Sequence, residues 1–269
     1  MNTIGFIGSG NMAEALIKGI INVRVYKPGS IFITDIKAER LNFVAQKYKV
    51  VPLSNNAELA AKVNILVLSV KPQNMTEALQ SIKDAIKPDT LVISIAAGIK
   101  VSRIAGALGD IAIVRVMPNT PALIGEGASA LFANEKAKPM LDKALSIFSS
   151  VGKAVVVKDE DLIDAVTAVS GSGPAYYFLL MEEMIKAAIE LGLPETIAKD
   201  LVLQTAKGAG LLAIEADKTG ETPAELRRKV TSPGGTTEAA MKVFTEGKFG
   251  PLVQAALKRA CERSKELSA

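Results

Sequence analysis

The chain of 269 residues contains no histidine and a single cysteine, Cys261. Without histidine it cannot build a Ser–His or Cys–His nucleophile, a histidine-bound zinc site or a histidine general acid. One cysteine excludes an intrachain disulfide and a cysteine-cluster metal site, and it favours a reducing, cytoplasmic compartment. We therefore expect no metal, and chemistry that uses Lys, Thr, Ser, carboxylates, backbone amides or a cofactor.

Long apolar runs and a strong charge excess are also lacking. No stretch reaches the roughly 18 unbroken apolar residues of a membrane-spanning helix, and the first residues enter a strand pattern instead of a secretory signal. The net charge is only +4, from 32 basic and 28 acidic residues. No basic run or basic–aromatic interleaving indicates nucleic acid, whereas an anionic small molecule is compatible with this charge. We expect neither a membrane nor a nucleic-acid partner.

Residues 1–158 alternate between short apolar runs and amphipathic stretches. The runs are rich in β-branched residues and are bounded by Gly, Pro or Asn, which is typical of buried strands. Amphipathic stretches such as residues 13–21, 38–47 and 75–86 indicate helices. The alternation predicts an α/β domain with a doubly wound, mostly parallel sheet of the Rossmann type. The expected strands are residues 4–7, 30–34, 64–70, 90–95, 111–117, 128–132 and 154–157.

Residues 159–269 show no convincing strand and predict an all-α domain. Gly192 suits a helix C-cap, and Pro194 and Pro223 stand where helices begin. About 110 residues in five or six helices can bury only part of their apolar surface, so this half favours a homo-oligomer over an ordinary monomeric core. The expected helices are residues 161–169, 175–191, 195–215, 223–230, 237–245 and 252–265.

The residues Gly8-Ser9-Gly10-Asn11-Met12-Ala13 follow the first strand and open the first helix. This is the GxGxxA dinucleotide fingerprint: Gly8 allows the tight turn, Gly10 lets a pyrophosphate approach, and Ala13 permits close packing of helix on strand. The helix N-terminus offers free N–H groups and the positive end of the helix dipole. The alternative is a glycine-rich turn without a ligand.

Asp35 ends the second strand, where the fold places the group that meets the adenosine ribose. An acid there accepts bonds from both ribose hydroxyls and repels a 2′-phosphate, so Asp35 favours NADH over NADPH. Lys37 and Arg40 leave NADPH open, because either could reach a 2′-phosphate. Asp35 could instead be a surface residue that caps the next helix.

The carboxyl ends of the central strands should face one ligand crevice. Lys71 is the basic residue there and suits a phosphate or a substrate carboxylate, or it is simply a solvated lysine before a turn. Two further segments, residues 170–174 and 231–237, combine small hydroxyl residues with glycines and interrupt helical patterns. Such segments expose backbone N–H groups that suit a carboxylate, although each could be a plain helix–helix connection. The groups expected at the crevice are Asn56, Lys71, Pro72, Ala96, Ala97, Pro118 and Asn119.

Four segments together resemble the pyrroline-5-carboxylate reductase family: residues 161–176, 230–237, 117–121 and 96–98. The resemblance runs from Ile4 to about Glu266. It implies a Rossmann domain and a helical dimerisation domain whose helices interlock between subunits, often in larger rings. It implies that the substrate carboxylate binds Ser232, Gly234, Gly235 and Thr236, with Thr237 near the ring nitrogen. It implies that NADPH or NADH binds Gly8, Ser9, Gly10, Asn11, Met12, Asp35, Asn56, Val70, Lys71, Pro72 and Ala97.

The activity implied by this resemblance is reduction of 1-pyrroline-5-carboxylate, a cyclic imine, to L-proline. The cofactor delivers hydride to C5, and the protein binds and orients. The candidate catalytic residues are Thr237, whose hydroxyl can bond the ring nitrogen, and Lys71. Many family members have Ser or Asn at the position of Asp35, often followed by Arg, whereas Ile36 follows here. This departure weighs against the family's usual NADPH preference.

Two other functions stay open on the sequence. A β-hydroxyacid dehydrogenase of the 6-phosphogluconate type shares the architecture but needs a general base, for which Lys186 and Lys207 are candidates. A nucleotide-sensing dimer would keep the fold without the reaction, although the intact segment 231–237 argues against it.

Overall fold

The computed structural model describes residues 3–268, which form two compact units. The first unit contains residues 3–174 and 259–268, and the second contains residues 175–258. The expected domain boundary at residue 158 therefore lies inside the first unit. Residues 159–174 and the last turns of the chain belong with the sheet, because they share buried contacts with it.

The first unit is built on an eight-stranded sheet with the order β3-β2-β1-β4-β5-β6-β7-β8, in which only the β6–β7 pair is antiparallel. This confirms the doubly wound, mostly parallel Rossmann fold. Seven strands occupy predicted runs. The two-residue β3 (Val51–Pro52) was not predicted, because it is too short to show a pattern. The other strands are β1 (Ile4–Ile7), β2 (Ile31–Thr34), β4 (Ile65–Leu68), β5 (Leu91–Ser94), β6 (Ala112–Met117), β7 (Gly127–Ala133) and β8 (Gly152–Val156).

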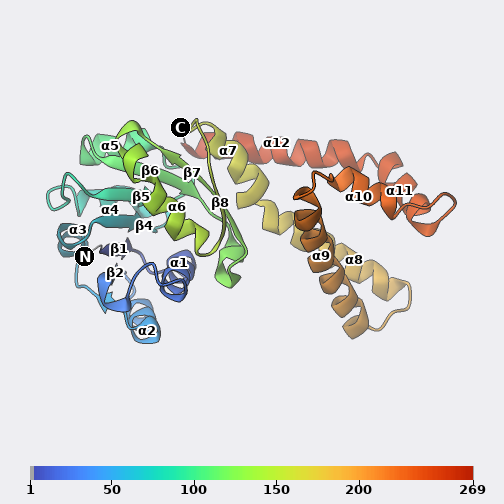
Figure 1. Ribbon diagram of the computed structural model, residues 1–269, viewed down its shortest axis with the longest axis horizontal. Coiled ribbons are helices and arrows are strands. Elements are labelled where there is room, and N and C mark those ends of the chain that lie inside the picture. The colour runs from blue at the N-terminus through green and yellow to red at the C-terminus, as the bar shows by residue number, and fades with distance from the viewer. Residues whose placement is uncertain (1–2, 269) are drawn as a thin grey trace. The chain divides into compact units, whose positions relative to one another are not determined.

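Helices cover both faces of this sheet (Figure 1). One face packs Phe6 against α1 (Asn11–Asn22), α2 (Ala38–Tyr48) and α6 (Leu141–Ser149). The other packs Ile7 and Leu66 against α3 (Asn56–Lys62), α4 (Met75–Gln80) and α5 (Val101–Leu108). Alternate residues of the central strands thus enter different cores, as expected where a sheet is buried on both sides.

Helix α4 ends earlier than the predicted stretch 75–86. The Ser81 hydroxyl donates to the Ala78 carbonyl over 2.7 Å and competes with the helical backbone pattern there. The chain then continues through single turns, with the Ile82 amide bonded to the Leu79 carbonyl.

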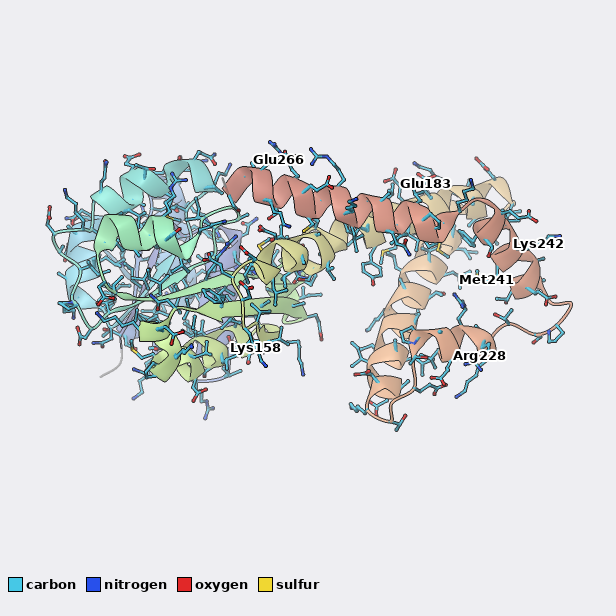
Figure 2. All side chains as sticks on the ribbon, turned by 90° about the horizontal axis from the view of Figure 1, so that it is seen from above. Lys158, Glu183, Arg228, Met241, Lys242 and Glu266 are labelled. Carbon is cyan, nitrogen blue, oxygen red and sulfur yellow. The ribbon has the colours of Figure 1, made fainter. Side chains whose placement is uncertain are left out.

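The predicted helices after residue 159 are confirmed, with Gly192 in a left-handed conformation (φ +96°) after α8 and Pro223 at the start of α10. No helix within residues 3–268 has the combined length and apolarity needed to cross a membrane. The second unit carries the side chains of α8 to α11, among them Glu183, Arg228 and Met241 (Figure 2). The helices are α7 (Leu162–Val166), α8 (Gly173–Glu190), α9 (Glu195–Asp217), α10 (Pro223–Lys229), α11 (Thr236–Glu246) and α12 (Phe249–Ser268).

The expected interruption near residues 170–174 is present, but as a π-helical turn and a bend at Ser172 instead of a loop. The chain passes from α7 through a π-helical turn (Thr167–Gly171) into α8, and the Ser172 amide donates to the Thr167 carbonyl over 2.8 Å. The Ser170 hydroxyl bonds back to the Val166 carbonyl over 3.1 Å. Small residues accommodate the wider turn, and the hydroxyl groups satisfy helix carbonyls instead of marking a loop.

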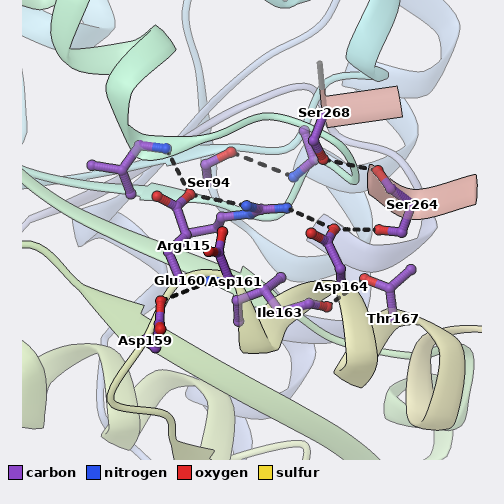
Figure 3. Close-up of polar contacts among 12 residues, drawn as sticks. Ser94, Arg115, Asp159, Glu160, Asp161, Ile163, Asp164, Thr167, Ser264 and Ser268 are labelled. Carbon is purple, nitrogen blue, oxygen red and sulfur yellow. Dashed lines mark hydrogen bonds and ion pairs between the residues drawn. The ribbon is translucent and has the colours of Figure 1, made fainter. Parts of the chain in front are cut away.

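A buried ion network ties α7 and α12 to the sheet (Figure 3). Arg115 of β6 is only 2% exposed, and it donates to Glu160 over 2.9 Å and lies 4.0 Å from Asp164. Ser264 of α12 donates to Asp164 over 2.6 Å, and the Val101 amide donates to Glu160 over 2.8 Å. A strand, two helices and the start of α5 are thereby joined through one guanidinium.

Candidate dinucleotide and substrate site

The glycine-rich turn after β1 has room for a pyrophosphate. Gly8 adopts φ +89°, and a Cβ there would lie 2.8 Å from the Ser69 carbonyl oxygen. Gly10 is the N-cap of α1, and a Cβ there would meet no atom within 4 Å. The space in front of Gly10 and the first amides of α1 is therefore open, as a dinucleotide requires. Asn11 and Met12 form the first helical residues behind it.

Asp35 bonds the glycine-rich turn directly. Its Oδ2 accepts from the Ser9 amide at 2.7 Å and from the Ser9 hydroxyl at 2.9 Å, while Oδ1 accepts from the Lys37 amide at 2.8 Å. Both carboxylate oxygens thus fix the junction of β1, β2 and α2. Because β1 and β2 are parallel and in register at Ile7 and Thr34, Asp35 stands beside the turn, where the ribose of a bound dinucleotide would lie.

Arg40, one of the two cations named above as possible 2′-phosphate ligands, is already bound. Its Nε donates to the Ser9 carbonyl over 2.7 Å, and its Nη2 forms an ion pair with Glu14 of α1. Lys47 and Tyr48 also donate to Glu14, over 2.9 and 2.8 Å. Burial works to raise the pKa of Glu14, but the hydrogen bonds from Lys47, Arg40 and Tyr48 outweigh it and lower that pKa to about 2.

Sequence reasoning did not single out Glu14. An acid in the first turn of a helix is common for dipole reasons alone, so the position of Glu14 carried no signal of its own. Only the fold brings α2 beside α1 and places Arg40 over the glycine-rich turn.

The carboxyl ends of β4, β5 and β6 meet at one edge of the sheet, as their register shows. Val70, Lys71 and Pro72 follow β4 there, and Lys71 is exposed. Ala97 follows β5 and is half-buried. Asn56, the first residue of α3, accepts from the Thr34 hydroxyl over 2.6 Å.

Asn119 does not face this crevice as a free group, contrary to expectation. Its Oδ1 accepts from the Ala128 amide over 2.8 Å, and its Nδ2 donates to the Ser170 carbonyl over 3.1 Å. Both ends of this amide are used to join the chain after β6 to β7 and to the π-helical turn.

The segment 231–237 forms a turn that opens α11 in the second unit. Gly234 adopts φ +72°, its amide donates to Glu238 over 2.8 Å, and the Gly235 amide donates to the Ser232 carbonyl over 3.0 Å. Gly235 is the N-cap of α11, so Thr237 is not a capping residue. Within residues 3–268 the Thr237 hydroxyl has no hydrogen-bond partner, and neither Thr236 nor Thr237 uses its backbone amide in a turn.

The two lysines considered as general bases lie on α8 and α9. Lys186 forms ion pairs with Glu182 at 2.6 Å and Glu183 at 2.8 Å, and these carboxylates raise its pKa further above the ordinary lysine value. A general base must be uncharged near neutral pH, so Lys186 is poorly suited to that role. Lys207 is exposed.

Comparisons with known proteins cover nearly the whole chain. Residues 160–267 match the family model described as pyrroline-5-carboxylate reductase dimerisation, and residues 3–98 match that of the coenzyme F420-dependent NADP oxidoreductases. The pyrroline-5-carboxylate reductase of Pseudomonas aeruginosa is 46% identical over 98% of this chain and 96% of its own. That of Synechocystis is 42% identical over 98% and 97%.

Solved structures of pyrroline-5-carboxylate reductases superpose closely on this chain. A pyrroline-5-carboxylate reductase from Coxiella burnetii superposes with a TM-score of 0.93 at 41% identity, covering 100% of this chain and 99% of that one. A Plasmodium falciparum pyrroline carboxylate reductase with NADP bound superposes with a TM-score of 0.88 at 32% identity, covering 100% and 98%.

Proposed function

We propose, since the chain belongs to the pyrroline-5-carboxylate reductase family, that it transfers hydride from NADH or NADPH to the C=N bond of 1-pyrroline-5-carboxylate and yields L-proline. The chain is an NAD(P)-dependent oxidoreductase. The observation that carries the proposal is the N-terminus of α11. Its Thr237 hydroxyl and the adjacent amides are unoccupied within the described residues, as a ring nitrogen and a carboxylate would require.

The first unit supplies the residues for the cofactor, which brings a hydride to the reaction when bound. The amides at Gly10 and Asn11 and the dipole of α1 would hold the pyrophosphate, and Asp35 would face the ribose. Val70, Lys71 and Pro72 at the end of β4, with Ala97 after β5 and Asn56 at α3, would line the same crevice. Ser9 holds this turn through its bonds to Asp35 and Arg40, and Met12 packs against the core beneath α1.

The second unit supplies the residues for the imine. The amides of Thr236 and Thr237 would hold the carboxylate together with the Ser232 hydroxyl. Glu238 already occupies the Gly234 amide and the Ser232 carbonyl the Gly235 amide, and both bonds order the turn. The Thr237 hydroxyl can donate to or accept from the ring nitrogen, so it follows the change from iminium to amine without titrating. Lys71 would add a positive charge for a phosphate or the substrate carboxylate.

The chain forms a homo-oligomer. We propose that residues 159–269 act as one dimerisation domain, that the subunits pair through it, and that dimers can join in rings. Support comes from apolar side chains left exposed on α8 and α9, such as Tyr177, Phe178 and Leu212. An apolar groove of about 410 Å³ beside β7, β8 and α7, within the first unit, supports a second contact between copies. We place the enzyme in the cytoplasm, where the one cysteine suits the reducing conditions.

A substrate comparison tests this function. Purified protein is incubated with NADH and with NADPH, each with pyrroline-5-carboxylate, and in parallel the oxidised cofactors are supplied with 3-hydroxy acids. We expect oxidation of the reduced cofactor and formation of L-proline with the imine alone. Turnover of the 3-hydroxy acids instead would favour a β-hydroxyacid dehydrogenase, and binding of nucleotide without any turnover would favour a sensor.

A further inference from the structure

Arg40 and Asp35 hold the same residue of the glycine-rich turn from two sides. Asp35 accepts hydrogen bonds from the Ser9 amide and hydroxyl, at 2.7 and 2.9 Å, and Arg40 donates one to the Ser9 carbonyl at 2.7 Å. The guanidinium and the Asp35 carboxylate are therefore both bonded to Ser9, next to the proposed ribose position. An arginine at this place is the group that would recognise a 2′-phosphate through paired charged hydrogen bonds.

Glu14 holds the Nη2 end of the Arg40 guanidinium in an ion pair. Its side chain is only 14% exposed, and it binds the Arg40 guanidinium on one oxygen and Lys47 and Tyr48 on the other. With a pKa lowered to about 2, Glu14 stays charged throughout the physiological range. Arg40 Nη1 has no partner within residues 3–268, but a paired contact of a 2′-phosphate with Nη1 and Nη2 would displace Glu14. That exchange would leave a half-buried carboxylate with one cation fewer, which opposes it.

We propose that Glu14 is a specificity-determining residue for the cofactor: by holding Arg40 in an ion pair, it withholds the cation that would bind the 2′-phosphate and so favours NADH over NADPH. Asp35 adds direct repulsion of the same phosphate. The proposal rests on the proposed function to the extent that Gly8 to Met12 bind a dinucleotide. Exposed Lys37 remains as the cation that still lets NADPH bind.

Nucleotide affinity measures this role without turnover. Kd values for NADH and NADPH come from the fluorescence of the bound reduced nicotinamide, and those for 5′-ADP and 2′,5′-ADP from calorimetry. In Glu14→Gln we expect NADPH and 2′,5′-ADP to bind about tenfold more tightly, which is the size of one charged hydrogen bond to a phosphate. NADH and 5′-ADP should change by less than about threefold, since they carry no 2′-phosphate.

Two further variants make the test specific. Glu39→Gln removes an exposed carboxylate in the first turn of α2. Within residues 3–268 this carboxylate makes no ion pair, so the variant should leave the preference between NADH and NADPH unchanged. Arg40→Ala loosens Ser9 for both cofactors, so alone it should leave the ratio of the NADPH and NADH affinities nearly unchanged. In the Glu14→Gln background it should remove the gain in that ratio. The measurement on Arg40→Ala alone requires only that this variant folds, so it still tests the proposal if Glu14→Gln fails to fold.

The outcomes separate the two proposals. The role of Glu14 would be overturned by an unchanged NADPH affinity in Glu14→Gln, or by a tenfold loss of NADPH affinity relative to NADH affinity in Arg40→Ala alone. In either case a wild type that reduces the imine keeps the proposed function. A wild-type protein that binds none of the four nucleotides would overturn both.

Discussion

Gly8 and Gly10 lie two residues apart in one turn, yet they are glycines for different reasons. At Gly8 the backbone is left-handed and a Cβ would press on the Ser69 carbonyl, so the fold requires the glycine. At Gly10 a Cβ would meet nothing within 4 Å, so the fold does not require glycine there, and we expect the reason to be a bound ligand.

We predict that Gly10→Val folds normally and loses NADH binding, because its side chain fills the space of the pyrophosphate. Gly8→Val should instead lower the free energy of unfolding by about 1–3 kcal/mol, from the strained backbone alone, and so unfold at a lower denaturant concentration. Urea unfolding and fluorescence titration distinguish the two. A folded Gly10→Val variant with wild-type NADH affinity would refute the placement of the cofactor.

Thr237 offers a second prediction at this scale. In Thr237→Ala, single-turnover hydride transfer with saturating NADH should slow by about 10², the lower end for a lost preorganised hydrogen bond, because water can fill part of the gap. Thr237→Ser keeps the hydroxyl and should keep most of the rate. Since Gly235 and not Thr237 caps α11, stability should change little. A wild-type rate in Thr237→Ala would remove this residue from the mechanism.

Single residues were predictable when a motif fixed their place and not otherwise. The GxGxxA pattern and the end of β2 located Gly8, Gly10 and Asp35 from the sequence. The partners of Glu14 are 26 to 34 residues away in the chain, so no local pattern announces them. The sequence pattern predicts the correct sheet edge for Asn119, but not that its side chain bonds Ala128 and Ser170.

At the scale of elements, the periodicity predicted the strands and helices because burial on both faces makes nearly every strand residue apolar. The break expected at residues 170–174 is a π-helical turn and a bend instead of a loop, since glycine and serine also fit such a turn between two helices. Arg115 in the run 111–117 is a further feature that periodicity cannot interpret. Its partner Glu160 lies two residues before α7 and its partner Asp164 lies within α7, more than 40 residues later in the chain.

Breaking the Arg115 network should destabilise the first unit. Asp164→Ala leaves the guanidinium with Glu160 alone and deprives Ser264 of its acceptor, so we expect a loss of about 3 kcal/mol in the free energy of unfolding. The exposed Asp161→Ala, three residues earlier, is the matched control and should cost less than about 0.5 kcal/mol. Urea unfolding followed by circular dichroism measures both. Equal effects in the two variants would mean that the network adds no stability.

At the scale of the whole molecule, the apolar groove beside β8 predicts a contact between copies. Val155 on the edge strand is 45% exposed and Val169 in the π-helical turn is 60% exposed. A solvent-exposed apolar sheet edge tends to associate with another chain. We predict that Val155→Glu with Val169→Glu lowers the mass of the full chain measured by light scattering. Ile36→Glu, at an exposed site outside the groove, should leave the oligomer intact. An unchanged mass in the double variant would remove the groove from the interface.

Isotope transfer tests the central claim most directly. The full-length protein is supplied with 1-pyrroline-5-carboxylate and nicotinamide cofactor that carries deuterium on the transferred position of C4, and the product is analysed by mass spectrometry and NMR. Direct hydride transfer predicts L-proline with one deuterium, located at C5. Formation of no proline, or of proline without deuterium at C5, would contradict the assignment of this chain as a reductase of the cyclic imine.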